Sequence, residues 1–183
     1  MFLMQHTTDE RDEYWQRLSA YTFARNSRGA PWAVLRHVAA LLGEHGIAES
    51  HVTYGFLEPS TWLILLVTED ARLIKLHAEF EAEQYDRDEE LQPIRQSHPV
   101  VSTVREAWVR HLSDVARLDI GEVTGRAGPF GDLRGDQFNI GDVHLTFSDG
   151  QKEDLEISQA TMSHDDRAKS DAFISALREA AKL

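Results

Sequence analysis

Two segments near the start of the chain carry apolar side chains every three to four residues, which is the pattern of helices with one buried face. The first has Trp15, Leu18 and Tyr21 at this spacing. The second follows Pro31 and contains Trp32, Leu35, Val38, Ala39 and Leu42. Together they predict a helical hairpin over residues 8–46, whose paired apolar faces favour a packing role over a catalytic one.

After residue 50 the helical spacing of apolar residues ends, and runs rich in β-branched and aromatic residues follow, which is typical of β-strands. Three runs rich in β-branched and aromatic residues predict an antiparallel meander; they are residues 52–57, 61–68 and 72–81. In the third run, apolar residues alternate with Lys75, His77 and Glu79. We therefore expect that strand to have one buried and one solvated face.

The second half of the chain predicts a helix, three strands and a final helix. Helical spacing of apolar residues predicts a helix over 100–113; these residues are Val101, Val104, Trp108 and Leu112. The predicted strands are 117–124, 137–148 and 153–159. Apolar positions change parity near Gly141 within the second of them, which predicts a β-bulge there.

A capped amphipathic helix is predicted at the end of the chain. Ser163 is followed by acidic residues, as is common at a helix N-terminus. One apolar face then contains Ala172, Phe173, Ala176, Leu177 and Ala180.

The order of these elements resembles the pleckstrin-homology-like (PH-like) superfold, and its bacterial members in particular, over residues 51–183. Three features carry the resemblance: the strand pair in 61–75, the Leu-Thr-Phe-Ser-Asp-Gly hairpin at 145–150, and the closing helix with Phe173 and Ile174. The resemblance implies an α+β fold in which an antiparallel β-sandwich or half-barrel is capped by a C-terminal helix. It also implies a scaffold that more often binds peptides, proteins or lipids than performs chemistry.

We accordingly expect two domains, an N-terminal helical hairpin over 1–48 and a PH-like β domain over 49–183 with a helix inserted near 100–113. Members of this superfold usually have seven strands, whereas six are predicted here. The sequence leaves open whether a seventh strand lies within residues 82–95. Lipid headgroup binding at the usual loop is not expected, because residues 52–69 contain no Lys or Arg.

The composition narrows the classes of function. Nineteen Lys and Arg against 31 Asp and Glu give a net charge of −12, which disfavours binding to nucleic acid or to an anionic membrane surface. The absence of cysteine excludes disulfides and thiol chemistry and fits a reducing compartment. The longest dense apolar run, 62–67, is far shorter than a membrane span. We expect a cytoplasmic protein without integral membrane association.

Five residues are candidates for binding. Arg126 and Arg134 lie within a glycine-rich segment, 125–136, which is either a flexible connection or a loop that orders on contact with an anion or acidic peptide. Lys75 and His77 lie on the predicted solvated strand face. Trp62 is expected near the mouth of the sandwich, together with Phe80 and Arg126, if the protein binds a lipid or small ligand.

No motif predicts a catalytic residue, a cofactor or a metal site. Nucleophile elbows and phosphate loops are missing from the sequence. His77, Glu79 and His144 are the best candidates to share an ion, but nothing in the sequence makes them converge.

The leading hypothesis is a non-enzymatic adaptor that binds another protein, in a process that the sequence does not identify. Such a partner should be basic or have an apolar groove, and binding should weaken as salt rises. The alternatives are a lipid or small-ligand binding protein of PH-like fold, and an enzyme whose site is assembled from distant residues. Homo-oligomerisation stays open, because four tryptophans are many for 183 residues.

Overall fold

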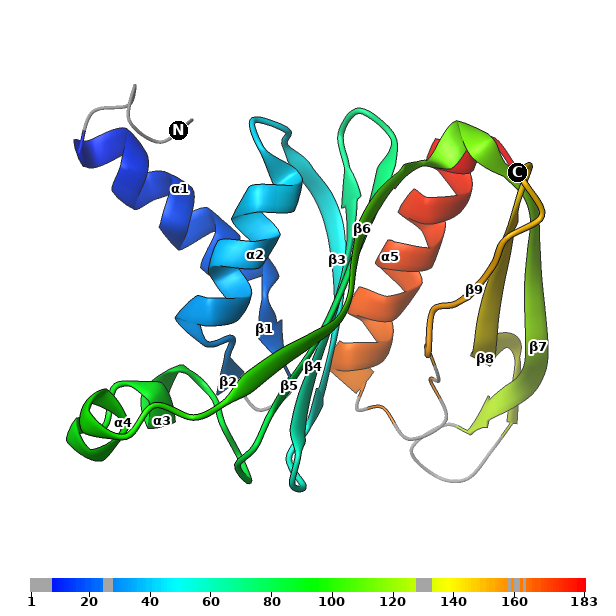
Figure 1. Cartoon of the computed structure of the whole chain (residues 1–183). Coiled ribbons are helices and arrows are strands. Elements are labelled where there is room, and N and C mark those ends of the chain that lie inside the picture. Colours follow the sequence, from blue (N-terminus) through cyan, green and yellow to red (C-terminus); the bar gives the residue numbers. More distant parts are fainter. Residues whose placement is uncertain (1–7, 25–27, 128–132, 158, 160–161, 163) are drawn as a thin grey trace. The chain divides into compact units, whose positions relative to one another are not determined.

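A computed structural model describes residues 8–24, 28–127, 133–157, 159, 162 and 164–183 (Figure 1). Within these ranges, the side chains of residues 127, 133–137 and 164 are not described. The chain is α+β with antiparallel sheets and divides into two compact units, Met1–Arg110 and His111–Leu183. Each unit has its own sheet and helices and is described by itself below.

The first unit combines helices with a sheet in the order β3-β4-β5-β6. Its elements are α1 (Thr8–Tyr21), β1 (Phe23–Ala24), β2 (Arg28–Gly29), α2 (Trp32–Leu42), β3 (Ile47–Gly55), β4 (Ser60–Thr68), β5 (Arg72–Phe80), α3 (Arg87–Glu90), α4 (Pro93–Ser97) and β6 (Ser102–His111). The two N-terminal helices and the first three strands of the meander lie where the sequence predicts them, and the short β1–β2 ladder joins the helices.

The helices and the sheet of the first unit share one core. Val34, Leu35 and Val38 of α2 are buried in the same cluster as alternate residues of β4 and β5. Trp62 lies at its centre with 0% of its surface exposed, and its indole N–H donates to the Tyr85 carbonyl at 2.8 Å. Hairpin and sheet thus belong to one compact unit that extends to Arg110, whereas the sequence analysis placed a domain boundary at residue 48.

The strand β5 alternates as predicted, but its second face is only partly solvated. Ile74 and Leu76 lie in the core, and His77 and Glu79 are half-buried. Lys75, in contrast, is 3% exposed, and its ammonium forms an ion pair with Glu106 Oε2 at 2.8 Å. The expectation of a wholly solvated face is wrong at Lys75 because the cross-strand neighbour on that face, Leu65, is itself buried.

Residues 102–111 form strand β6 and not the helix predicted over 100–113. The spacing of Val104 and Trp108 by four residues fits either structure, since two residues four apart share a face in a helix and in a strand. Pairing decides the outcome: β6 joins the sheet beside β5, and the Glu81 N–H donates to the Val101 carbonyl at 3.0 Å where the two segments meet.

The segment 82–95, in which the sequence left a seventh strand possible, contains no strand among its described residues and forms the short helices α3 and α4. Side chains of α3 bind the helical hairpin, and we refer to the contacts of Arg87 as the clamp. The Arg87 guanidinium donates to the Ala30 carbonyl at 3.2 and 3.1 Å and to Ser19 Oγ at 3.1 Å, and it lies 4.7 Å from the Trp32 ring centroid. Glu90 Oε2 accepts the Trp32 N–H at 2.6 Å, which satisfies a free donor at the start of α2.

The second unit contains η3 (Leu112–Asp114), β7 (Val115–Ala127), β8 (Leu133–Phe147), β9 (Lys152–Asp154) and α5 (His164–Ala181). The sheet order is β7-β8-β9, and both pairings are antiparallel. The first two predicted strands and the final helix are present, but of the strand predicted over 153–159 only the short β9 forms, and residues 155–157 and 159 are not in a strand. The predicted cap Ser163 lies outside the described residues. Strands β7 and β8 extend into the segment 125–136 that was predicted to be a loop.

The predicted bulge at Gly141 is wrong. Glu122 pairs with Gly141 and Val123 with Ile140 in one continuous register, and the register shifts lie near the ends of β7. The change of parity comes from Asp142, whose φ of 43° is left-handed. Gly121 makes room for it, since a Cβ at Gly121 would lie 3.1 Å from the Asp142 Cβ.

Within the described residues, no helix combines the length and the apolar character needed to cross a membrane.

The clamp around Arg87 predicts a measurable loss of stability in Arg87→Ala. This change removes the bonds to Ala30 and Ser19 and the contact with Trp32, so we expect the free energy of unfolding in urea to fall by about 2–3 kcal/mol. Arg36→Ala, at an exposed position of α2, is the matched control and should change it by less than about 0.5 kcal/mol. Equal effects of the two substitutions would contradict the clamp.

Tyr54 on β3 predicts a change of stability at alkaline pH. Burial, and secondarily the charge of Asp86, raises the pKa of its phenol to about 12. The folded state therefore holds this proton more tightly than the unfolded chain, and the resulting stabilisation is lost as the pH rises from about 10 through about 12. Absorbance titration at 295 nm should detect this group in the wild type and in Tyr21→Phe, and should lose it in Tyr54→Phe.

Candidate functional site

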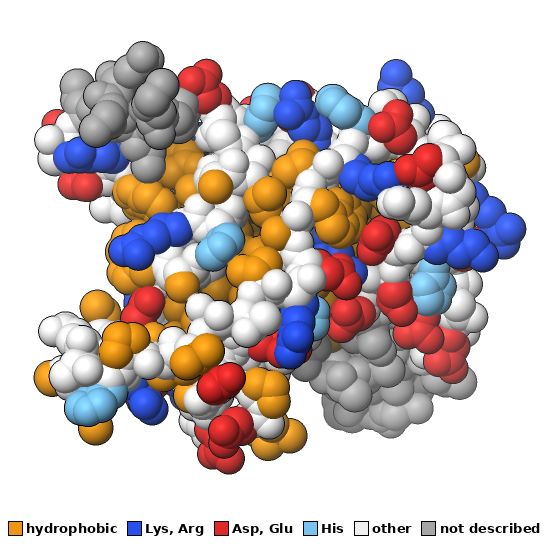
Figure 2. Space-filling model, viewed as in Figure 1, with side chains coloured by type: hydrophobic (Ala, Val, Ile, Leu, Met, Phe, Trp, Pro, Cys, Tyr) orange, Lys and Arg blue, Asp and Glu red, His pale blue; other side chains and the backbone are white. Residues whose placement is uncertain are grey.

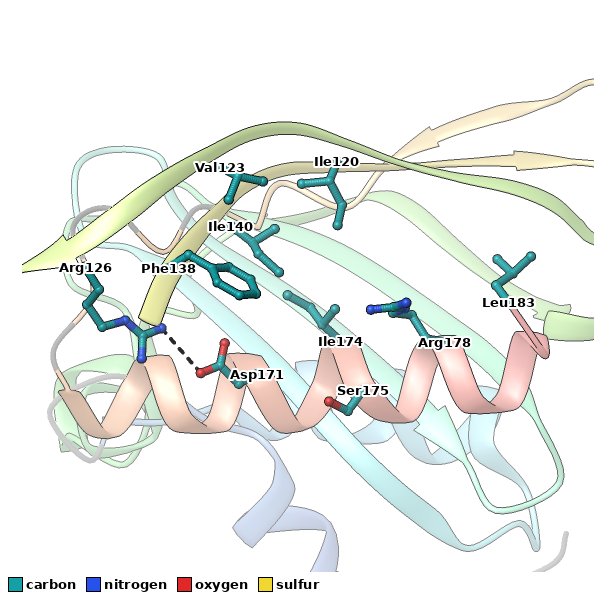
Figure 3. A pocket seen from close by; sticks show the side chains of 10 residues that line it. All are labelled: Ile120, Val123, Arg126, Phe138, Ile140, Asp171, Ile174, Ser175, Arg178 and Leu183. Carbon is teal, nitrogen blue, oxygen red and sulfur yellow. Dashed lines mark hydrogen bonds and ion pairs between the residues drawn. The ribbon is translucent and has the colours of Figure 1, made fainter. Parts of the chain in front are cut away.

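An open groove of about 850 Å³ lies in the second unit, between the β7–β8 hairpin and α5 (Figure 3). Most of its walls are apolar, with charged side chains toward both ends. The lining residues are Ile120, Val123, Arg126, Phe138, Ile140, Asp171, Ile174, Ser175, Arg178 and Leu183.

The floor of the groove is buried and its rim is exposed to solvent. Ile140 and Ile174 are buried, with 8% and 3% of their surfaces exposed. On the rim, Val123, Phe138 and Leu183 are 60%, 50% and 51% exposed. Apolar side chains that are half exposed beside a buried floor favour binding, because burying their surface stabilises a complex by about 25 cal/mol for each Å² of apolar area.

Gln159 connects the two elements that form the groove, because it makes hydrogen bonds to both β8 and α5. Its N–H donates to the Ile140 carbonyl at 2.9 Å, and its side-chain Oε1 accepts the Ile140 N–H at 2.8 Å. Its Nε2 donates to Ser170 Oγ at 3.1 Å and to Asp171 Oδ1 at 2.7 Å, both on α5. Strand β9 ends at Asp154, so Gln159 occupies the hydrogen-bonding place beside β8 that a longer strand would have filled.

Two arginines lie at the groove and differ in their contacts. Arg126, with 15% of its side chain exposed, donates to Asn139 Oδ1 at 3.2 Å and lies 3.4 Å from Asp171 Oδ2. Arg178 lies on α5 one turn after Ile174 and is exposed. In Figure 3 its guanidinium points back along the helix toward Ile174.

Of the residues that the sequence singled out, Arg126 lines the groove. Arg134 pairs with it across the β7–β8 ladder, and the side chain of Arg134 lies outside the described residues. The other three belong to the first unit: Trp62 is fully buried in its core, Lys75 is buried against Glu106, and His77 is half-buried opposite Leu63. Phe80 is 2% exposed in the same core, so a ligand at the surface would contact neither Trp62 nor Phe80.

Sequence reasoning missed Phe138, Ile174 and Arg178 as groove residues. A signal for the last pair was present, because Arg178 follows Ile174 by four residues on a predicted helix and so lies above it on the same face. Phe138 gave no such signal, since an exposed and a buried aromatic residue look alike in a strand pattern.

Two smaller hollows in the first unit are polar. One of about 200 Å³ lies beside Glu79, which accepts from Arg105 at 2.7 Å; this hydrogen bond lowers the pKa of the Glu79 carboxyl. The other, of about 320 Å³, surrounds the ion pair of Arg28 with Asp86. Among the described residues, no group of three or more His, Asp and Glu is placed to hold a metal ion.

The negative charge of the chain is spread out on the visible face. In Figure 2, acidic side chains lie on several parts of this face, among basic, histidine and apolar side chains.

Comparison with known proteins gives no relative: no family model matches the chain, and neither a curated protein nor a solved structure is significantly similar to it.

The role of Gln159 can be tested by Gln159→Leu, which keeps the side-chain volume but leaves the Ile140 N–H and Ser170 without their partner. We expect the free energy of unfolding to fall by about 2–4 kcal/mol and hydrogen exchange at the Ile140 amide to accelerate more than tenfold. Gln151→Leu at an exposed turn is the control. Unchanged exchange at Ile140 would show that the floor does not depend on Gln159.

Proposed function

We propose that this chain is a non-enzymatic, cytoplasmic adaptor that binds a segment of another protein in the groove of its second unit. The observation that carries the proposal is the preformed apolar floor under an open rim, with Val123 and Phe138 half in solvent. Aromatic and aliphatic side chains in this state are typical anchors of protein interfaces.

The openness of the groove favours a protein segment over a lipid or small molecule. Small-ligand sites enclose most of the ligand surface, whereas here the rim residues Val123, Phe138 and Leu183 keep half or more of their surface in solvent. A straight helix and a curved β-hairpin form the two walls (Figure 3), and an extended or helical segment can lie along such a groove.

A PH-like scaffold over residues 51–183 is part of the same proposal. Strands β3 to β9 number seven among the described residues and are followed by α5, which matches the strand number and the closing helix that the resemblance implies. The seventh strand is then β6, and the N-terminal helices and α3–α4 are additions to that plan.

Site-specific photo-cross-linking tests the proposal. With p-benzoylphenylalanine in place of Phe138, irradiation in an extract of the source cells should give a discrete protein adduct, and Val123→Asp in the same chain should abolish it. The matched control carries the photoreactive residue in place of Ile94, which is 61% exposed on α4 of the first unit.

Mass spectrometry of the adduct distinguishes the possible occupants. An adduct with a second protein supports the proposal and identifies the partner. Adducts with a second copy of this chain, adducts of lipid mass alone, or equal labelling from both positions would overturn it in favour of a self-associating protein, a ligand-binding protein or non-specific contact.

A further inference from the structure

We infer that the bound segment carries one Asp or Glu between apolar side chains, and that Arg178 recognises its carboxylate. This inference rests on the proposed function and adds the chemistry of the partner. It depends on three features of the groove: the position of Arg178, the different state of Arg126, and the apolar surroundings of both.

Arg178 is placed to contact an occupant. It lies on the last turns of α5 and lines the groove together with Ile174, one helical turn before it. Its guanidinium points along the groove in Figure 3 and has no hydrogen-bond or ion-pair partner among the described residues. Its five N–H donors are therefore available to a ligand.

Arg126, toward the other end, has partners within the chain. Asn139 accepts from its Nε, and the Asp171 carboxylate lies beside its Nη2. Asp171 in turn accepts from Gln159. The groove thus has one arginine that is bonded within the chain and one whose donors face solvent, and this asymmetry gives a bound segment a direction.

The apolar floor makes the charge of Arg178 selective. A segment that covers Ile174 and Phe138 also removes water from around the guanidinium, which must then find another acceptor. A carboxylate supplies it in bidentate geometry, whereas a neutral or basic residue leaves the arginine unsatisfied and is rejected.

The net charge of the chain limits how acidic the segment can be. At −12 the protein repels an acidic tract at long range, so a run of acidic residues would approach slowly. A single carboxylate among apolar residues, in a partner that is neutral or basic elsewhere, can pair with Arg178 without strong repulsion by the net negative charge of the chain.

A random dodecapeptide phage library selected on the immobilised full chain tests this inference. The wild type should enrich peptides with apolar residues around one Asp or Glu. Arg178→Glu should shift that position to Lys or Arg, and Lys152→Glu, an equal change of charge at an exposed β9 residue, should leave it acidic. Circular dichroism checks that each variant is folded.

One synthetic peptide from the selection makes the test quantitative. By fluorescence polarisation, Arg178→Gln should weaken binding of this peptide about tenfold, replacing its acid by the amide should do the same, and combining the two changes should add little. The control Lys152→Gln should leave the affinity unchanged.

The outcomes distinguish a failure of the role of Arg178 from a failure of the groove as a protein-binding site. Enriched peptides that require Phe138 but lack an acidic residue, or keep it with Arg178→Glu, overturn the role of Arg178 and leave the groove as a protein-binding site. If no enrichment depends on Phe138, tested by Phe138→Asp, the proposed function itself fails.

Discussion

The second unit depends on Gln159, whose backbone and side chain together make the hydrogen bonds to β8 that a longer β9 would otherwise make. Strand β8 is longer than β9, so the N–H and carbonyl of Ile140 would have no hydrogen-bond partner in β9. Gln159 bonds both groups and also holds α5 through Ser170 and Asp171. Because a buried amide is satisfied only in one geometry, sheet and helix are held at a fixed separation, and the groove between them is preformed.

The same network prepares the chemistry of the groove. Asp171 is shared between Gln159 and Arg126, so the arginine toward one end is held by the structure that builds the floor. Arg178 lies outside this network. In the proposed function, the buried apolar floor would supply affinity to a partner through the area it covers, and Arg178 would orient the partner through its charge.

Sequence patterns were sufficient where one period dominated. The helices of the hairpin, the strand β5 and the closing helix were predicted because their apolar residues follow a single period. Strand β4 was predicted from its run of β-branched, aromatic and other apolar residues. The candidate Arg126 was also found from sequence, although it was expected in a loop and lies at the end of β7. The excess of acidic residues and the absence of cysteine needed no structure at all.

Tertiary structure decided what depends on neighbours distant in sequence. Val104 and Trp108 fit a helix and a strand equally well, and only pairing beside β5 made them β6. Lys75 sits at a polar position of an alternating strand, yet its cross-strand neighbour Leu65 and Glu106 make it buried. The groove required β8, Gln159 and α5 to meet, and no local pattern of residues specifies such a meeting, because its energy comes from contacts that exist only after the chain has folded.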